Sequence, residues 1–201
     1  MDLLKRRNIE DDEANLYINV LEQKAGRLKT LTEDLLEASK ISSGNLALNM
    51  ERIDINELMK QCVGEFDNRF RELGLTIVMD ASGKAAYINA DSRRMWRVMD
   101  NLFNNICKYA LENTRVFVDT ECQDGNVHIT FKNTSKQQLD VRGEELTERF
   151  IRGDSSRATE GSGLGLYIAK SLTEAQGGSF EIGLDGDLFK VFLTFPEYMT
   201  T

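Results

Sequence analysis

The fold is decided by the segment Glu160-Gly161-Ser162-Gly163-Leu164-Gly165-Leu166, which runs directly into Tyr167-Ile168-Ala169-Lys170-Ser171-Leu172. Every second residue from 161 to 165 is glycine, so one side of the backbone carries no Cβ atom. The apolar residues that follow are spaced as in a helix, and backbone amides at the start of such a helix can converge on an anion. The segment therefore predicts a phosphate site, although the same glycines would also suit a flexible hinge.

The composition is that of an ordinary globular protein. The chain has 201 residues, of which 41% are hydrophobic and 29% charged, so it can hold one full domain and a smaller appendage around a real core. Its net charge of -8 argues against nucleic acid as a partner, because the sequence has no basic stripe to neutralise phosphates along a strand.

The cysteines and the apolar runs bear on the compartment. Cys62, Cys107 and Cys122 are isolated in the sequence, so we expect neither a disulfide framework nor a zinc site, and a reducing compartment is the simplest interpretation. No apolar run approaches the ~20 residues that cross a bilayer. Residues 1–7 become polar too early for a secretory signal. We therefore expect a soluble segment.

Residues 1–44 predict a helical hairpin. Residues 1–7 are typical of the end of one helix, and residues 8–12 supply turn and N-cap chemistry for a second, longer one. A helix of about 30 residues is longer than the side of a domain this small, so we favour dimerisation over packing on its own chain. The second helix carries a coiled-coil seam, with steps of three and four residues between Ala14, Tyr17, Leu21, Lys24, Leu28, Leu31, Leu35 and Ala38.

Ser42-Ser43-Gly44 breaks this helix and divides the chain into a dimerisation segment, residues 1–44, and a second domain, residues 45–201. In the second domain, alternating patterns predict strands and amphipathic patterns predict helices. The helices are expected to begin at Asp54 or Asn56, at Asp91 and at the glycine segment. The strands are expected at residues 46–55, 75–79, 86–90, 115–120, 126–132, 179–183 and 188–195.

Turn residues complete the predicted architecture. Asp124-Gly125 and Asp185-Gly186 are expected to turn two hairpins, and Pro196 is expected to end the last strand. Residues 133–160 are polar, with one short helical stretch at residues 144–150, and predict a long connection over a binding site. The whole pattern predicts an α+β sandwich, a mixed sheet with helices on one face, preceded by the remnant of a helical hairpin.

Two asparagines interrupt the apolar pattern of the helix that begins at Asp91. Asn101 and Asn105 are four residues apart and therefore share one face, with Lys108 one turn further along. An amide oxygen suits Mg²⁺, and a lysine can meet a phosphate as a point charge. The same face could equally be turned to solvent, so these residues alone leave both interpretations open.

Three motifs taken together are much more specific. Asn101-x-x-x-Asn105-x-x-Lys108-Tyr109 is followed by Glu148-Arg149-Phe150-x-Arg152-Gly153-Asp154-x-Ser156-Arg157 and then by Gly161-x-Gly163-x-Gly165-Leu166. This arrangement resembles the ATP-binding domain of sensor histidine kinases, a Bergerat-type α/β sandwich in the wider GHKL family of gyrase-type and chaperone ATPases. The resemblance covers residues 45–196, and the helix before it looks like the second helix of the family's dimerisation hairpin.

The resemblance implies roles for these residues. Asn105 would coordinate the Mg²⁺ that bridges the phosphates of ATP, with Asn101 beside it. Five further side chains would contact the nucleotide or form part of its lid. Lys108 and Arg152 would neutralise phosphate oxygens, with Arg157 as a third candidate, while Tyr109 would lie against the nucleotide and Phe150 would anchor a mobile lid. Backbone amides would wrap the triphosphate along Gly161, Ser162, Gly163, Leu164, Gly165 and Leu166.

The sequence departs from the family where an Asp-x-Gly-x-Gly box should follow the asparagine helix. In the family this Asp accepts a hydrogen bond from the amino group of adenine, whereas Asn133 stands at that position here and the glycines are missing. An amide oxygen can still accept the bond, but without the added strength of a charge, and its NH₂ group needs a partner of its own. We expect adenine nucleotide still to bind, more weakly. The alternative is a degenerate pocket kept only as scaffold.

The resemblance also implies the reaction, which is phosphoryl transfer from Mg-ATP to a histidine of the helical hairpin and onward to a response-regulator receiver domain. We expect that histidine to precede this sequence, because His128 lies in a predicted strand. This segment should therefore hold no catalytic residue of its own and should not phosphorylate itself. It should be the cytoplasmic part of a membrane-anchored parent that dimerises through the hairpin.

Two other functions fit the sequence less well. The first is a non-catalytic module for dimerisation and regulator docking, in which the long helix is the working surface and the nucleotide pocket is vestigial. The second is an ATPase of the chaperone or repair type, which is disfavoured because nothing in the chain resembles the additional domains of those proteins.

Overall fold

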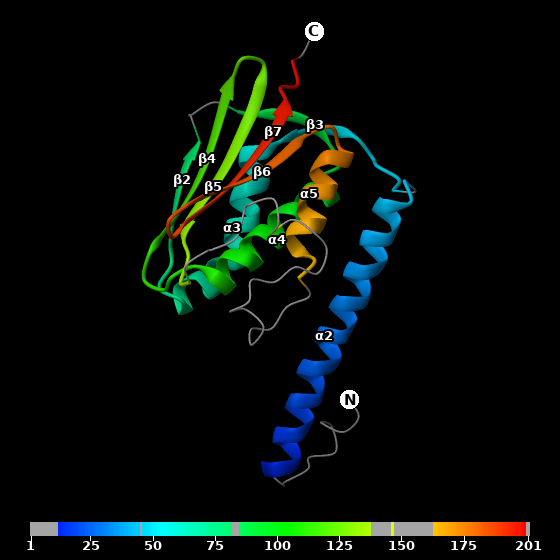
Figure 1. The fold of residues 1–201 in the computed structure, drawn as a ribbon, viewed down its shortest axis with the longest axis vertical. Helices are drawn as coiled ribbons and strands as arrows, with labels where there is room; N and C mark the ends of the chain where they lie inside the picture. The colour runs from blue at the N-terminus through cyan, green and yellow to red at the C-terminus, as the bar shows by residue number, and fades with distance from the viewer. Residues whose placement is uncertain (1–11, 45, 82–84, 138–145, 147–162, 200–201) are drawn as a thin grey trace.

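The computed structural model describes residues 12–44, 46–81, 85–137, 146 and 163–199 (Figure 1). It consists of one long helix, α2 (Asp12–Ser42), and an α/β sandwich that spans residues 51–196. The helices of the sandwich are α3 (Ile55–Glu72), α4 (Ser92–Tyr109) and α5 (Gly165–Ala175). The strands are β1 (Glu51–Asp54), β2 (Thr76–Ala81), β3 (Tyr87–Ala90), β4 (Arg115–Gln123), β5 (Asn126–Thr134), β6 (Ser179–Asp185) and β7 (Leu188–Pro196).

The main sheet has five strands in the order β2-β4-β5-β7-β6. Adjacent strands of this sheet are antiparallel, except that β2 and β4 are parallel. The sheet is therefore mixed, as predicted. Strands β1 and β3 form a separate antiparallel pair, which the sequence analysis did not foresee. The strands expected at residues 75–79 and 86–90 therefore belong to different sheets.

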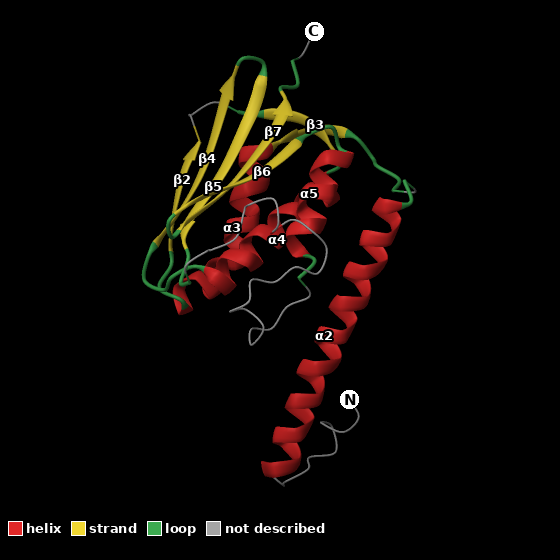
Figure 2. Cartoon of the chain, viewed as in Figure 1, coloured by secondary structure: helices red, strands yellow, loops and turns green. Residues whose placement is uncertain are grey.

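Helices α3, α4 and α5 cover one face of the main sheet (Figure 2). Alternate residues of the three central strands β4, β5 and β7 are buried, as Val127, Ile129, Phe131 and Asn133 are on β5. This one-sided cover confirms the predicted α+β sandwich with helices on one face.

Four phenylalanine rings hold the helices on the sheet. Phe103 of α4 is fully buried, and its ring centroid lies 5.5 Å from Phe66, 5.7 Å from Phe70 and 5.5 Å from Phe131. Phe66 and Phe70 come from α3 and Phe131 from β5, so one side chain of α4 joins all three elements. Rings at these distances and tilts attract one another beyond the gain from burial alone.

Aspartates start two of the helices. The Asp54 carboxylate accepts from the amide of Asn56 at 3.0 Å and caps α3, which decides between the two predicted start points. The Asp91 carboxylate caps α4 as predicted and accepts from the amide of Arg94 at 3.0 Å.

The strand expected at residues 46–55 is shorter than predicted. Only Glu51–Asp54 pairs with β3, and residues 46–50 have no regular structure. The backbone amide of Asn49 donates to the Asp91 carboxylate at 2.8 Å, so it is used by the start of α4 and not by a strand partner. Burial by itself would raise the pKa of Asp91, but the amides of Asn49 and Arg94 outweigh it and leave that pKa lowered.

The two predicted hairpins form, one of them with a shifted turn. Asp124 and Gly125 both have positive φ, 51° and 73°, as a two-residue hairpin turn with Asp-Gly requires. In the last hairpin Asp185 pairs with Leu188, so the turn is Gly186-Asp187 and not Asp185-Gly186. Gly186 takes the position with φ of +58°, which glycine adopts without strain.

Helix α2 is continuous, as predicted, and runs away from the sandwich with its C-terminal end beside α5 (Figure 1). Near that end Ala38 is buried, and the Ser42 hydroxyl lies 3.3 Å from the Tyr167 hydroxyl. Along the rest of the predicted seam, the large side chains of Tyr17, Leu21, Leu28 and Leu35 are each more than half exposed. The helix thus packs on its own chain at one end and leaves its seam uncovered further along.

The first helix of the predicted hairpin, residues 1–7, lies outside the described residues. Within the described residues, no helix is both long enough and apolar enough to traverse a bilayer.

We expect Phe103→Ala to lower the free energy of unfolding by about 3–5 kcal/mol, because it removes a fully buried ring and leaves a cavity among three others. Phe192→Ala is the matched control, since this ring is 37% exposed on β7. Urea unfolding followed by circular dichroism measures both variants. An equal loss of unfolding free energy in the two variants would contradict the central place of Phe103 in the core.

Candidate functional site

Helix α4 carries the first group of predicted site residues. Asn101, Asn105 and Lys108 are half-buried on one side of the helix. The Asn101 amide donates from Nδ2 to the carbonyl of Arg97 at 2.9 Å, which fixes the orientation of this side chain. No described residue makes a hydrogen bond to the side chain of Asn105, so its amide oxygen is available to a ligand.

The start of α5 lies against this row of side chains. A Cβ atom placed on Gly165 would lie 3.2 Å from Oδ1 of Asn101, so the two helices approach closely and a larger residue would crowd the contact. Gly163, with φ of +72°, adopts a backbone conformation that other residues avoid. The structure therefore brings the asparagine helix together with the described part of the glycine segment, which begins at Gly163.

The residue at the start of α5 supplies no side-chain cap. Leu164 is the N-cap residue and makes no capping hydrogen bond. Its side chain is buried in the core, so only its backbone can meet a ligand. Uncapped amides at a helix start favour an anion, through both their hydrogen bonds and the helix dipole.

The other end of α4 is joined to the end of β5. The amide of Lys136 donates to the carbonyl of Tyr109 at 2.9 Å, and the amide of Leu111 donates to the carbonyl of Thr134 at 2.8 Å. These bonds hold Tyr109 beside the segment that follows Asn133. The Lys108 ammonium lies 5.5 Å from the centre of the Tyr109 ring, within range of a cation–π contact.

Asn133 is 3% exposed and has one unsatisfied atom. Its Nδ2 donates to the carbonyl of Thr134 at 3.2 Å, which supplies the partner that the NH₂ group was predicted to need. Its Oδ1 is buried, and no described residue donates to it. A buried acceptor without a donor lowers the folding stability by about 1–3 kcal/mol. A donor on a bound ligand would recover this loss.

Several predicted site residues lie outside the described residues. They are Phe150, Arg152, Arg157, Gly161 and Ser162, together with most of the connection predicted at residues 133–160. Of the short helix expected at residues 144–150, only Leu146 is described, and it packs against the core.

Other polar residues around α4 were missed by the sequence analysis. Asn104 accepts from Arg69 of α3 at 2.7 Å and donates to Asp100 at 3.0 Å, so this asparagine fastens α4 to α3. Gln176, at the end of α5, accepts from the amide of Asp91 at 2.8 Å in a buried contact. Arg69 and Asn104 are far apart in the sequence, and so are Asp91 and Gln176. No local pattern could have revealed these two contacts.

The cysteines take no part in this chemistry. Burial raises the pKa of the Cys62 thiol to about 12, and it also raises the pKa of Cys107. Both thiols therefore stay protonated at neutral pH and are poor nucleophiles and poor metal ligands. In the part of the chain that the structure describes, no three His, Cys, Asp or Glu side chains are grouped as metal ligands.

A family model described as histidine kinase-, DNA gyrase B-, and HSP90-like ATPase matches residues 90–198. The chain belongs to this family. The matched range begins just before α4 and ends just after β7, so it includes all the site residues named above.

Similar proteins narrow the group to sensor kinases. The probable sensor protein PcoS of Escherichia coli is 33% identical over 195 residues, which make up 95% of this chain and 41% of PcoS. The chain thus spans less than half the length of that protein. The predicted relationship to the ATP-binding domain of sensor histidine kinases is confirmed.

Solved structures agree on the fold. Full-length ShkA in complex with AMPPNP superimposes with a TM-score of 0.81 at 24% identity, covering 95% of this chain and 40% of ShkA. Histidine kinase ThkA in complex with the response regulator protein TrrA superimposes with a TM-score of 0.68 at 19% identity, covering 98% of this chain and 55% of that one. The predicted α/β sandwich is therefore the fold of histidine kinase catalytic domains.

We expect Asn133→Leu to leave the free energy of unfolding unchanged or to raise it by up to about 1 kcal/mol, because the change removes an unsatisfied acceptor and keeps a similar volume. The Thr134 carbonyl keeps its bond from Leu111. Urea unfolding without ligand measures the effect. A loss of more than about 2 kcal/mol would show that Asn133 serves the fold and not a ligand.

Proposed function

We propose that this chain positions Mg-ATP for transfer of its γ-phosphoryl group to a histidine outside these residues, from which a response-regulator receiver domain takes the group. The chain's membership of the ATPase family supports ATP as the substrate, and its sensor relatives support this kind of acceptor. The observation that carries the proposal is the contact between Asn101 and Gly165, because it sets the polar side of α4 against the start of α5.

The phosphates would lie between these two helices. The amide oxygen of Asn105 is a hard ligand of the kind that Mg²⁺ takes, and Asn101 stands beside it as a second amide. The backbone amides of residues 163–166 would donate to phosphate oxygens, and Lys108 would neutralise part of their charge. When bound, Mg²⁺ supplies charge neutralisation to the phosphates, and the chain supplies position and orientation.

The adenine would lie between the ends of α4 and β5. Oδ1 of Asn133 would accept from the amino group of the base, which would satisfy the buried acceptor. The Tyr109 ring would lie against the nucleotide. Phe150, Arg152, Arg157, Gly161 and Ser162 keep the roles that the family resemblance implies.

The acceptor histidine would come from another segment. His128, the single histidine of the sequence, lies within β5, where its Nδ1 is 3.1 Å from the Thr194 hydroxyl. A phosphoacceptor has to reach both ATP and the receiver domain, and a ring in the middle of a central strand is poorly placed for that. We therefore propose that the chain does not phosphorylate itself when alone.

The exposed seam of α2 would pair with a second copy in a membrane-anchored parent. Large apolar side chains at coiled-coil spacing are rarely left in water, and Tyr17, Leu21, Leu28 and Leu35 are such a set. A receiver domain is the further partner, as TrrA is for ThkA.

The same seam favours the second candidate, a docking and dimerisation module whose pocket is vestigial. Transfer of phosphate to a separately supplied helical-hairpin domain separates the two. A kinase transfers phosphate from Mg-ATP to that hairpin domain. Tight nucleotide binding without any phosphate transfer would favour the docking and dimerisation module.

We expect isothermal titration calorimetry to detect Mg-ATP binding, and Asn105→Ala to weaken it by about tenfold or more, or about 1.4 kcal/mol. The difference in ATP affinity between the unchanged chain and Asn105→Ala should shrink when Mg²⁺ is chelated, because the substitution removes a contact to the metal. Asn126→Ala, at the far hairpin turn, is the matched control and should bind as the unchanged chain does. Absence of nucleotide binding to the unchanged chain would overturn the proposal.

We expect Asn133→Asp to tighten ATP binding several-fold, because a carboxylate makes a stronger, charge-assisted bond to an amino group. The same change should lower the stability of the ligand-free protein by about 1–3 kcal/mol, since it buries a charge beside the Thr134 carbonyl. Calorimetry and urea unfolding measure the two effects. If Asn133→Asp binds ATP no more tightly than the unchanged chain does, the adenine base does not contact residue 133.

A further inference from the structure

The side-chain amide of Asn133 carries two opposite hydrogen-bonding groups at one buried position. Its Oδ1 only accepts hydrogen bonds and its Nδ2 only donates them, and a half-turn about the last side-chain bond exchanges the two. A carboxylate of the same size has two acceptors and no donor at neutral pH. Residue 133 can therefore present either an acceptor or a donor to a ligand, which an aspartate at this position could not do.

One weak contact sets the orientation of this amide. Nδ2 donates to the Thr134 carbonyl at 3.2 Å, at the long end of the range for such bonds. That carbonyl also accepts from the amide of Leu111 at 2.8 Å, so it keeps a partner when the Asn133 amide turns. The half-turn therefore loses a single long hydrogen bond, and the broad torsion of an Asn amide lets Oδ1 lean away from the carbonyl.

The neighbouring strands do not favour one orientation over the other. Asn133 is paired with Val116 of β4 and with Phe189 of β7, and both of these side chains are buried and apolar. Among the described residues, no donor reaches Oδ1 and only Thr134 accepts from Nδ2. The amide can thus turn according to the group that a ligand brings to it.

Purine bases differ in the group at position 6. Adenine has an amino group there, which donates, whereas hypoxanthine and guanine have a keto oxygen, which accepts. A carboxylate facing the keto oxygen would set two acceptors against each other, and a site built to bond one group rejects an analogue that cannot make the bond by about 10⁴-fold. The Asn133 amide has no such conflict, because it accepts from the amino group in one orientation and donates to the keto oxygen in the other.

We propose that this chain binds the nucleoside triphosphates of 6-oxo purines, hypoxanthine and guanine, as well as ATP, because the Asn133 amide turns to match the base. The proposal rests on the proposed function, which places the base against residue 133. It makes the nucleotide specificity of the chain broader than an aspartate would allow. The phosphates would be held in the same way for each base, since Asn105 and the amides of α5 would not contact position 6.

Isothermal titration calorimetry of the whole 201-residue chain with Mg-ATP and with Mg-ITP tests the proposal. ITP is the probe because hypoxanthine carries the keto oxygen without the additional amino group of guanine. We expect the unchanged chain to bind ITP within about tenfold of ATP, the difference being the lost bond to Thr134. ITP that binds more than about 100-fold more weakly than ATP would overturn the proposal and leave the proposed function standing.

Asn133→Asp is the diagnostic variant. It should bind ATP more tightly and ITP more weakly, so that the ratio of ATP to ITP affinity rises by about 100-fold or more. Comparing this ratio between the two proteins cancels the contacts to the sugar, the phosphates and the rest of the base. An unchanged ratio, with ATP bound by both proteins, would overturn the proposal. Absence of ATP binding to the unchanged chain would instead overturn the proposed function and this inference with it.

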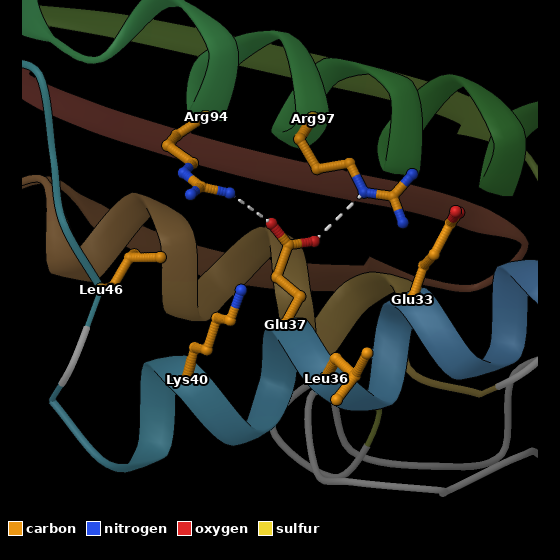
Figure 3. A pocket seen from close by; sticks show the side chains of 7 residues that line it. All are labelled: Glu33, Leu36, Glu37, Lys40, Leu46, Arg94 and Arg97. Atoms are coloured by element: carbon orange, nitrogen blue, oxygen red, sulfur yellow. Dashed lines mark hydrogen bonds and ion pairs between the residues drawn. The ribbon is translucent and has the colours of Figure 1, made fainter.

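Glu37→Gln is the matched control, because it makes the reverse exchange of carboxylate and amide outside the proposed site. Glu37 of α2 lies between Arg94 and Arg97 and accepts from them at 2.9 Å and 3.3 Å (Figure 3). Arg97 precedes Tyr109 by 12 residues, or about 18 Å along α4, so the ratio of ATP to ITP affinity should stay as in the unchanged chain.

Circular dichroism verifies the fold of each variant, and the comparison of ITP with ATP on the unchanged chain needs no substitution. A ratio that changes as much in Glu37→Gln as in Asn133→Asp would overturn the proposal as well.

Discussion

The packing of α4 is the constraint on which the rest of this structure depends. One helix has to fill the core through Phe103, support the start of α5 through Asn101 and hold α2 through Arg97. Phe103 lies on the buried side of the helix, whereas Arg97 and Asn101, four residues apart, share another side, which explains its mixture of rings, amides and charges. Few substitutions along α4 can therefore be neutral, because each side has its own neighbour to satisfy.

The candidate site includes two side-chain amide groups that lack a partner for at least one atom among the described residues, Asn105 and Asn133. Asn133 is held by the Thr134 carbonyl at one end of its amide and is unsatisfied at the other. The first amides of α5 have no side-chain cap, and no described residue bonds the Asn105 amide. Unsatisfied buried polar atoms lower stability, and these lie in the region that we propose binds the nucleotide.

Local signals in the sequence predicted most elements of the fold. Asp-Gly marked the turn between β4 and β5, and aspartates marked the starts of α3 and α4. The turn of the last hairpin was misplaced by one residue, but the larger error was non-local, because the amide expected in a strand at Asn49 is taken by Asp91, 42 positions away. For the same reason the contact of Arg97 with Asp34, 63 positions apart, has no signature in the sequence. The motifs predicted the approach of α4 to the glycine segment through a family resemblance, and no local spacing could have done so.

Helices α4 and α5 are fastened together at both ends. Asn101 meets Gly165 at the start of α5, and Gln176 at its end receives the amide of Asp91 just before α4 begins. The two antiparallel helices are thus closely packed at one end of α5 and hydrogen-bonded at the other, and together they form one plate against the sheet. The start of α5 therefore belongs to the same pair of helices that carries Arg97, and the proposed phosphate-binding amides share one mechanical frame with the long helix.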